Sequence, residues 1–188
     1  MSKSVSNSIG LGNCLHDGMV ESLRSDLMAR TFSIIVDSPF HWAFHNLPAS
    51  TRFELRFEGV ITLAAFSFEP WPGAVEPSPE TPWNEAQSQR FANSAKGRMV
   101  STSWNDFAVQ IGTNEEHIIL TAELVQGASD SLLKLGINSY PSSDYRDIEI
   151  NAEQLRTFIG EREYTLTEFT DFGDAYWNDG SARTEAKV

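Results

Sequence analysis

Two histidines four residues apart, His41 and His45, have the spacing in this sequence that best suits metal chemistry. On a helix they would share a face, and two imidazoles can bind a transition metal when another part of the chain supplies a third ligand. No Glu follows His41 as in the helix of a zinc protease, and the adjacent Trp42 and Phe44 are typical of packed side chains. We therefore expect these histidines to pack and form hydrogen bonds, and we predict no metal or other cofactor.

A third histidine, His16, stands next to Asp17, and a carboxylate beside an imidazole can orient it as a general base. We expect this pair to open a strand, in which neighbouring residues point to opposite faces. The two side chains would then not touch, and Asp17-Gly18 would be a turn leading into the strand. His16 and the remaining histidine, His117, are also the other imidazoles that could complete the metal site considered above.

Motifs for nucleophilic catalysis and for phosphate binding are not found. The sequence has no Gly-x-Ser-x-Gly elbow, and its one cysteine, Cys14, lies at the edge of a predicted flexible tail where no neighbour would activate its thiol. Gly10-Leu11-Gly12 lacks the third glycine and the preceding strand of a phosphate-binding loop. The sequence therefore supports neither a hydrolase nor a nucleotide site.

Carboxylates gather at Asp144, Asp147 and Glu149, close enough in sequence for two of them to share a site as in glycoside hydrolysis. Asp147 and Glu149 are two residues apart and would lie on one face of a strand, from which Arg146 points away. Such pairs are usually solvated, so we interpret this one as a charged surface and predict no catalytic residue in the chain.

The acidic C-terminal segment is the surface feature best suited to a partner. Acids steer basic proteins, and interleaved Tyr and Trp side chains supply anchors for an interface. The competing interpretation is a solubilising surface with a loosely docked tail. We predict a binding surface for a basic protein partner at Glu161, Glu163, Glu168, Asp171, Asp174, Tyr176 and Trp177.

Composition limits the partners and the compartment. The chain has 188 residues with 26 acidic and 14 basic side chains, and its net charge of -12 repels nucleic acid and anionic membranes. One cysteine allows no intrachain disulfide, which favours a reducing compartment, and residues 1–13 lack the apolar region of a secretion signal. We predict a cytoplasmic protein that binds neither nucleic acid nor membrane, and composition leaves its oligomeric state open.

The candidate histidines, carboxylates and aromatic residues must be positioned mainly by β-strands, because apolar and charged residues alternate along most of the chain. In the run 52–58, the side chains of Phe53, Leu55 and Phe57 would face the core. Gly59 ends that alternation and predicts a bulge or bend. Further runs predict hairpins at 18–23 with 30–36 and at 107–111 with 118–124, and strands at 133–137 and 148–150.

Two short helices are predicted beside the sheet. Ser38-Pro39 is a typical helix start, with Ser at the N-cap and Pro at the first helical position. A good N-cap at Asn151, followed three residues later by the capping partner Gln154, predicts another helix near 152–159.

These elements predict a mainly β fold, α+β at most: an antiparallel sandwich or partly closed barrel with one or two short helices. We expect one domain at 14–178, with flexible tails at 1–13 and 179–188. Five prolines make 69–85 a surface loop, whose Trp71 and Trp83 we expect to tuck back onto the domain.

The segment Leu-His-Asp-Gly-Met-Val at 15–20, followed by a hairpin and then by Phe-Glu-Gly-Val at 57–60, resembles a class of small bacterial domains. These domains are found among polymorphic-toxin immunity proteins and related uncharacterised β-rich families. The resemblance covers roughly the first third of the chain. It implies a non-catalytic, mostly β protein that acts by binding another protein.

The leading functional hypothesis is accordingly a protein-binding, immunity-like domain. The alternative is a small-ligand-binding β-barrel, in which Phe66, Phe68 and Trp104 line a cavity that a structure would reveal. Two further hypotheses are a metal-dependent enzyme built on His41 and His45 and a structural module within a larger assembly.

Overall fold

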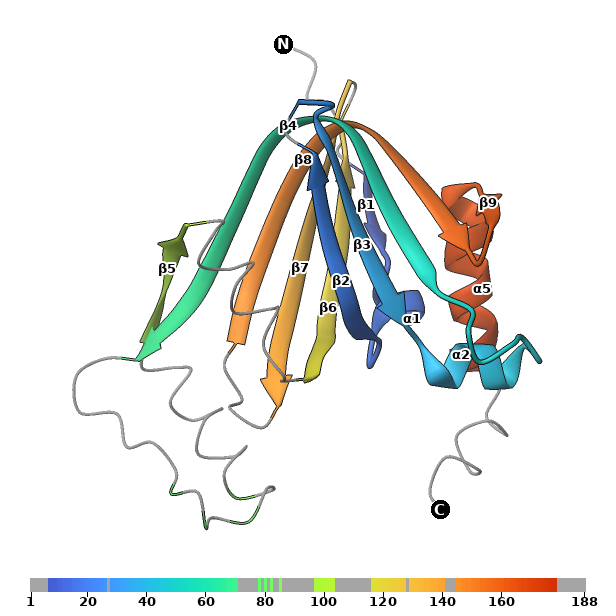
Figure 1. The fold of residues 1–188 in the computed structure, drawn as a ribbon, viewed down its shortest axis with the longest axis horizontal. Helices are drawn as coiled ribbons and strands as arrows, with labels where there is room; N and C mark the ends of the chain where they lie inside the picture. The colour runs from blue at the N-terminus through green and yellow to red at the C-terminus, as the bar shows by residue number, and fades with distance from the viewer. Residues whose placement is uncertain are drawn as a thin grey trace.

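Antiparallel strands make up most of the structure (Figure 1). A computed structural model describes residues 7–26, 28–70, 78, 80, 82, 85, 97–103, 116–127, 129–140 and 145–178. The strands are β1 (Asn7–Gly10), β2 (Met19–Asp26), β3 (Thr31–Asp37), β4 (Phe53–Pro70), β5 (Gly97–Thr102), β6 (Glu116–Gln126), β7 (Ser131–Tyr140), β8 (Tyr145–Ile159) and β9 (Arg162–Tyr164). The helices are α1 (Gly12–Leu15), α2 (Pro39–Phe44) and α5 (Leu166–Asn178). The predicted mainly β, antiparallel fold is confirmed.

The strands form one sheet that curves back toward its own start. β3 pairs with β2 and with the first half of β4, β8 pairs with β4 and β7, and β6 joins β7 to β2. The link from β2 to β6 is narrow: Met19 pairs with Ile118, and the Ile119 N–H donates to the Gly18 carbonyl (2.9 Å). Of the two predicted architectures, the partly closed barrel is therefore the one found. β1, β5 and β9 extend it beside β6, β4 and β8.

β4 and β8 are long strands that bend together over the top of the molecule in Figure 1. The bend of β4 lies at Gly59, whose φ of 64° belongs to the left-handed region that glycine adopts without steric cost. The register with β8 shifts between Val60 and Thr62, as at a β-bulge. The bulge or bend predicted at Gly59 is confirmed, and it lets β4 pair with β3 before the bend and with β5 beyond it.

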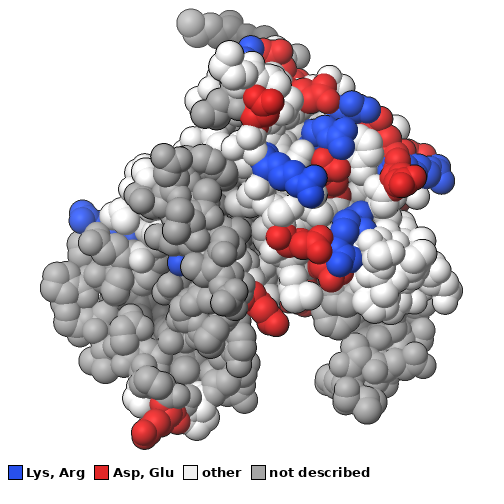
Figure 2. All heavy atoms as spheres, in the orientation of Figure 1, with Lys and Arg blue, Asp and Glu red and all other residues white. Residues whose placement is uncertain are grey.

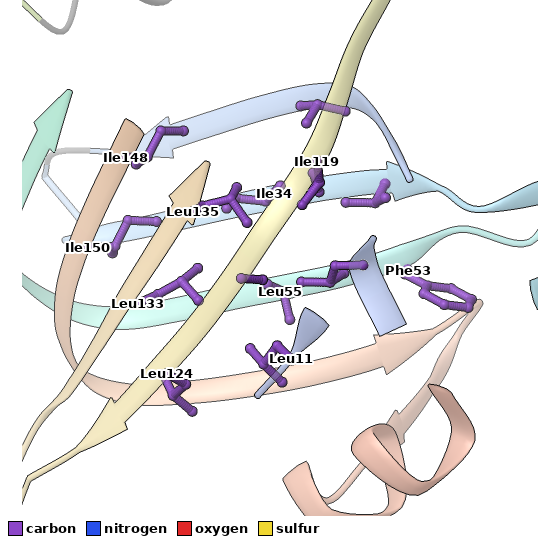
Figure 3. Close-up of a cluster of buried hydrophobic side chains, with 14 of the residues drawn as sticks. Leu11, Ile34, Phe53, Leu55, Ile119, Leu124, Leu133, Leu135, Ile148 and Ile150 are labelled. Carbon is purple, nitrogen blue, oxygen red and sulfur yellow. The ribbon is translucent and has the colours of Figure 1, made fainter. Parts of the chain in front are cut away.

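Inward-facing side chains fill the barrel. Phe53, Leu55 and Phe57 are each 0% exposed, as the alternation predicted, and the charged residues between them lie on the outer face. Leu and Ile side chains from β3, β4, β6, β7 and β8 point into the same space, and Leu11 enters it from the turn before α1 (Figure 3). Side chains with no exposed surface leave no water-sized space beside them, so the described interior is packed.

The helix predicted near 152–159 is wrong, because these residues form the second half of β8. Leu155 lies opposite Phe57 in the pairing with β4. The apolar spacing that suggested a helical face is also compatible with a strand, and pairing with β4, joined at the end by β9, satisfies the backbone of this segment. Long-range pairing therefore overrides the local capping signal at Asn151.

Two helices form where the sequence did not predict them. Residues 7–13, part of the predicted flexible tail, form β1 and the beginning of α1. The segment before Trp177, expected only to pack, is the helix α5. With α2, which begins at Pro39 as predicted, the described residues contain three helices and not the one or two expected. No helix in the described part of the chain has the length and apolar character needed to cross a membrane.

The remaining predictions divide between confirmed strands and undescribed segments. The hairpin at 18–23 with 30–36 is confirmed as β2 and β3, and the strands at 118–124, 133–137 and 148–150 are confirmed within β6, β7 and β8. Outside the described residues lie Trp71, Trp83, Trp104, the strand at 107–111, Asp144, the first six residues, 179–188 and most of 69–85.

Replacing Leu55 with Ala should destabilise the barrel by about 2–5 kcal/mol, because the change removes apolar contacts and leaves a cavity at a fully buried position. The matched control is Ile61→Ala on the same strand, where the side chain is 51% exposed. Its expected cost is at most about 0.5 kcal/mol. Urea denaturation followed by circular dichroism measures both, and equal losses would contradict the register of β4.

Candidate functional site

The three helices gather at one end of the barrel, at the lower right of Figure 1. There they bring together groups from distant parts of the chain: the His16–Asp17 pair, the His41/His45 pair and part of the acidic C-terminal set. We call this region the histidine corner and define it by His16, Asp17, His41, His45, Asp174, Tyr176 and Trp177.

α5 begins with a capping box that was not among the sequence predictions. The Thr165 N–H donates to the Glu168 carboxylate (2.8 Å), and the Glu168 N–H donates to the Thr165 hydroxyl (3.3 Å). The backbone hydrogen bond from Thr165 lowers the pKa of Glu168, so this acid stays charged where it caps the helix. One side of α5 is buried through Phe169, Gly173 and Tyr176. The Thr-x-x-Glu spacing before an apolar run was the signal that could have predicted this helix.

Gly173 allows α5 to lie directly against α1. A Cβ atom at this position would come within 2.5 Å of Cys14 Sγ and 2.6 Å of the Asn13 carbonyl carbon. The Cys14 thiol donates to the Phe169 carbonyl at 2.5 Å, which ties α1 to α5. Burial raises the pKa of Cys14 to about 12, so the thiol is protonated and unreactive at neutral pH.

His41 is buried among aromatic rings, with 1% of its surface exposed. Its ring centroid lies 4.9 Å from that of Tyr176, 5.5 Å from that of Phe53 and 6.0 Å from that of Phe172. Neither ring nitrogen completes a hydrogen bond among the described residues. Burial lowers the pKa of His41 from 6.5 to about 4, although the nearby backbone of Asn13 partly offsets this effect. The ring is therefore neutral at pH 7.

His45 faces α5 together with His41, as their helical spacing predicted, and both rings contribute to packing. The His45 ring is stacked on Phe172 with 3.6 Å between centroids, and its Nε2 lies 3.0 Å from the Phe172 carbonyl oxygen. The two imidazole centroids are 6.3 Å apart. Among the described residues, no group of three His, Cys, Asp or Glu side chains is placed to hold a metal ion.

His16 and Asp17 touch, contrary to the prediction. Nδ1 of His16 lies 3.0 Å from a carboxylate oxygen of Asp17, and the side chains are 42% and 43% exposed. The prediction assumed a strand, but Asp17 has a φ of 61° in the turn between α1 and β2, so the two side chains do not diverge. The Asp17 N–H donates to the Ile119 carbonyl (3.0 Å), which holds this turn against β6. The result is a partly exposed imidazole that lies beside a carboxylate.

Trp177 is held in place at the edge of the corner. Its indole N–H donates to the Asn13 carbonyl (2.8 Å), and its ring meets that of His16 edge to face at 5.7 Å between centroids. The Asn13 side chain in turn donates to Asp174 at 2.5 Å. Tyr176 is 7% exposed, so of the two predicted aromatic anchors it packs inside the cluster while Trp177 stays partly accessible.

The predicted acidic residues do not form one surface. Glu163 on β9 is paired with Arg156 (2.6 Å), and Glu161 is exposed in the turn before β9. Asp171 and Asp174 lie on α5, which contains no Lys or Arg. Neither of these two acids forms an ion pair with a Lys or Arg of the described chain. Of the predicted acids without such a pair, Asp174 therefore lies at the corner, Asp171 lies on the same helix, and Glu161 lies in the turn before β9.

A mixed-charge face covers β3, β4 and β8, where Figure 2 shows acidic and basic side chains interspersed. Exposed pairs of this kind each contribute little stability, and together they leave little net charge to attract a partner. The ion pairs are Glu54–Arg56, Glu58–Arg156, Glu153–Arg30 and Glu21–Arg52, with N···O distances of 2.9, 3.1, 3.1 and 2.7 Å.

The carboxylates of β8 lie apart from the corner. Asp147 and Glu149 share the outer face of the strand, as predicted, and Glu149 is paired with Lys134 (3.2 Å). Burial raises the pKa of Asp147, and the charge of Glu149 adds to that effect. Asp144, the third predicted member, lies outside the described residues. The described pair therefore fits a charged surface.

A buried polar cluster that the sequence did not predict lies where β6 and β8 begin and β7 ends. Nδ1 of His117 is 2.9 Å from the Ser139 hydroxyl, which also accepts a hydrogen bond from Arg146. All three side chains are at most 6% exposed. The alternation along β7 could have predicted that Ser139 is buried, because Ser139 follows Leu135 and Ile137 on the core side of this strand. His117 and Arg146 have further partners, so the cluster is a connected part of the barrel wall.

Comparisons with known proteins leave the site to be interpreted from its own geometry. No family model, curated protein or solved structure matches the chain.

Replacing Gly173 with Ala should destabilise the protein by about 1–3 kcal/mol, because the added methyl group would overlap Cys14 and push α5 away from α1. Ala has a higher intrinsic helix propensity than Gly, so without this overlap the substitution would be expected to stabilise α5. The matched control is Gly12→Ala in α1, where no atom lies within 4 Å of the added Cβ. Urea denaturation compares the two variants, and a neutral or stabilising Gly173→Ala would refute the close approach.

Cys14 should resist alkylation in the native protein. Because the thiol is 1% exposed and protonated at pH 8, we expect iodoacetamide to modify it more than about 100-fold slower than in the urea-unfolded chain. Mass spectrometry of the intact protein measures both rates. Equal rates in the two states would contradict the burial of Cys14 under α5.

Proposed function

We propose that this chain is a non-catalytic protein-binding domain of the bacterial cytosol, with a binding surface for a basic partner at the histidine corner. The observation that carries the proposal is the setting of Trp177, whose indole is partly exposed and fixed by the hydrogen bond to Asn13. Asp174 and the His16–Asp17 pair border it through Asn13 and the His16 ring.

An ordered tryptophan favours binding for a physical reason. Trp is enriched among the residues that dominate interface energies, because its large ring loses much contact with water when a partner covers it. A side chain already held in one conformation loses little entropy on association. Trp177 is held in this way by Asn13 and His16, and Tyr176 packs against its ring from within at 5.2 Å between centroids.

The charge at the corner favours a basic partner. Asp174 lies three residues before Trp177 on α5, Asp17 contacts the His16 ring that meets the indole, and Asp171 is exposed on the same helix, which contributes no positive charge. Acidic groups of this kind raise the association rate of a positively charged protein and exclude acidic ones. The mixed-charge face on β3, β4 and β8 lacks this bias because its acids are paired with Arg. Among the described surfaces, the corner is thus the one best suited to the predicted partner.

The resemblance to immunity-type domains supports the same function from a different part of the chain. Its segment 15–20 contains His16 and Asp17, which the structure brings to the corner. A single cysteine that is buried and protonated is compatible with a reducing cytosol. We therefore retain an immunity-like role as the form of protein binding that we propose.

The alternative, a small-ligand-binding barrel, has less support in the described interior. Phe66, one of the proposed lining residues, pairs with Asp147 on the outer face of the sheet, while its neighbour Ala65 points inward and is 2% exposed. The inward residues that surround this position, such as Ile148 and Ile150, have no exposed surface. These contacts favour a filled barrel that serves as a scaffold for the corner.

Two substitutions on α5, one of them at the corner, test the proposal. Tagged protein captures its partner from the native host, and surface plasmon resonance then measures the affinity and the association rate of the purified pair. Trp177→Ala should weaken binding by about 30-fold or more, because it removes the anchor. Asp171→Lys, at an exposed helix position, should slow association and reduce its dependence on salt.

The matched control is Glu80→Lys, which makes the same charge change at an exposed residue far from α5 in sequence. It should leave the salt dependence of association close to that of the unmodified chain. Circular dichroism verifies that each variant is folded. A partner that binds Trp177→Ala and Asp171→Lys as tightly as Glu80→Lys would exclude the corner from the interface.

A further inference from the structure

We propose that α5 is a pH-responsive latch, which docks on α1 and α2 at neutral pH and opens as His41 takes up a proton while the barrel stays folded. The observation behind this proposal is the enclosure of His41 between α2, the start of β4 and α5. A proton on this ring can be fully hydrated only if α5 moves away. The inference does not require the proposed partner, because opening is a property of the chain alone.

α5 can separate from the barrel because side chains hold it, whereas backbone ladders hold the strands. Phe169 packs edge to face on Phe53 at 5.8 Å between centroids, and Phe172 packs on His45. Three hydrogen bonds join α5 to α1. The Cys14 thiol donates to the Phe169 carbonyl, the Asn13 side-chain amide donates to Asp174, and the Trp177 indole donates to the Asn13 carbonyl. Elements attached in this way open at lower free energy than strands paired on both sides.

Protonation of His41 acts directly on this contact. The neutral ring lies among Phe53, Phe172 and Tyr176, where a cation would lose its hydration. The aromatic faces attract a cation and offset part of that loss. The loss of hydration is the larger effect, since burial is the main cause of the lowered pKa of His41.

The titratable groups around His41 do not reverse this direction. On α2, the charge of a protonated His45 would oppose that of His41, and burial lowers the pKa of His45 as well. On α5, the Tyr176 ring packs against His41, and Asp174 is engaged by Asn13. Cys14 on α1 is protonated throughout. The outer groups are Asp17, which contacts His16, and Asp37, which lies 3.5 Å from Arg52 and accepts from the Trp42 indole at 3.3 Å.

The pH range follows from the two pKa values of His41. With α5 open, the ring is exposed and has its ordinary pKa near 6.5, whereas with α5 docked the pKa is about 4. Between these values the open form binds the proton better, so docking weakens as the pH falls through this window. From pH 7 to pH 5, proton linkage predicts an increase of about 20-fold in the population of the open form.

Cys14 provides a specific readout, because it is the one cysteine of the chain and lies beneath α5. A pyridyl disulfide reagent, which reacts with thiols at both pH 5 and pH 7, is added to the full chain, and labelling is followed by absorbance. Each rate is divided by that of the urea-unfolded chain at the same pH, which removes the intrinsic pH dependence of the thiol. Amide hydrogen exchange of β7 and β8, corrected in the same way, reports whether the barrel stays closed.

The expected result is a normalised labelling rate about 20-fold higher at pH 5 than at pH 7, with unchanged protection of β7 and β8. His41→Phe should remove most of this pH dependence and leave the part due to His45, whose pKa burial also lowers. His41→Leu serves if the first variant does not fold. The control Glu80→Gln, at an exposed residue outside the corner, should retain it. A rate independent of pH, a rise that is undiminished without His41, or a parallel loss of protection in β7 and β8 would each overturn the latch.

Discussion

The antiparallel pairing of β4 with β8 is the interaction on which the rest of the structure depends. It runs from Phe53 opposite Ile159 to Ser67 opposite Arg146, and both strands bend together after Gly59. One ladder therefore serves two walls of the barrel, because β4 continues to β3 before the bend and β8 continues to β7 beyond it. The bend directs the two halves of the ladder to different walls, so that β2 and β6 can close the sheet between β3 and β7.

The histidine corner is a consequence of where this ladder ends. β4 begins at Phe53, just after α2, and β8 ends at Ile159, just before β9 and α5, so the pairing of these two ends brings α2 and α5 to the same place. α1 reaches them because Leu11 and Leu15 belong to the core. Gly173 then sets the distance between α1 and α5. The indole, the imidazoles and the acids meet because the two longest strands are in register.

Much of the fold could be predicted, and the failures have identifiable causes. Alternation located Phe53, Leu55 and Phe57, since an apolar face with a period of two residues is characteristic of a half-buried strand. The prediction failed at 152–159, where apolar spacing fits either a helix or a strand and pairing with β4 decided the outcome. It failed at α5 because the Thr165–Glu168 capping box lies in a segment dominated by acidic charge. It failed at Asp17 because a positive φ cannot be inferred from the residue type alone.

The sequence by itself determined the strands with clear alternation, such as the first half of β4, their inward faces, the bend at Gly59 and the residue types available for binding, because these follow from local periodicity and backbone freedom. Only the tertiary structure decided that His16, His41 and Trp177, separated by most of the chain, share one corner, and that Tyr176 is buried while Trp177 is partly exposed. The physical reason is that burial and proximity depend on which strands pair across long distances. That choice is made by the whole barrel and is not encoded in any short segment.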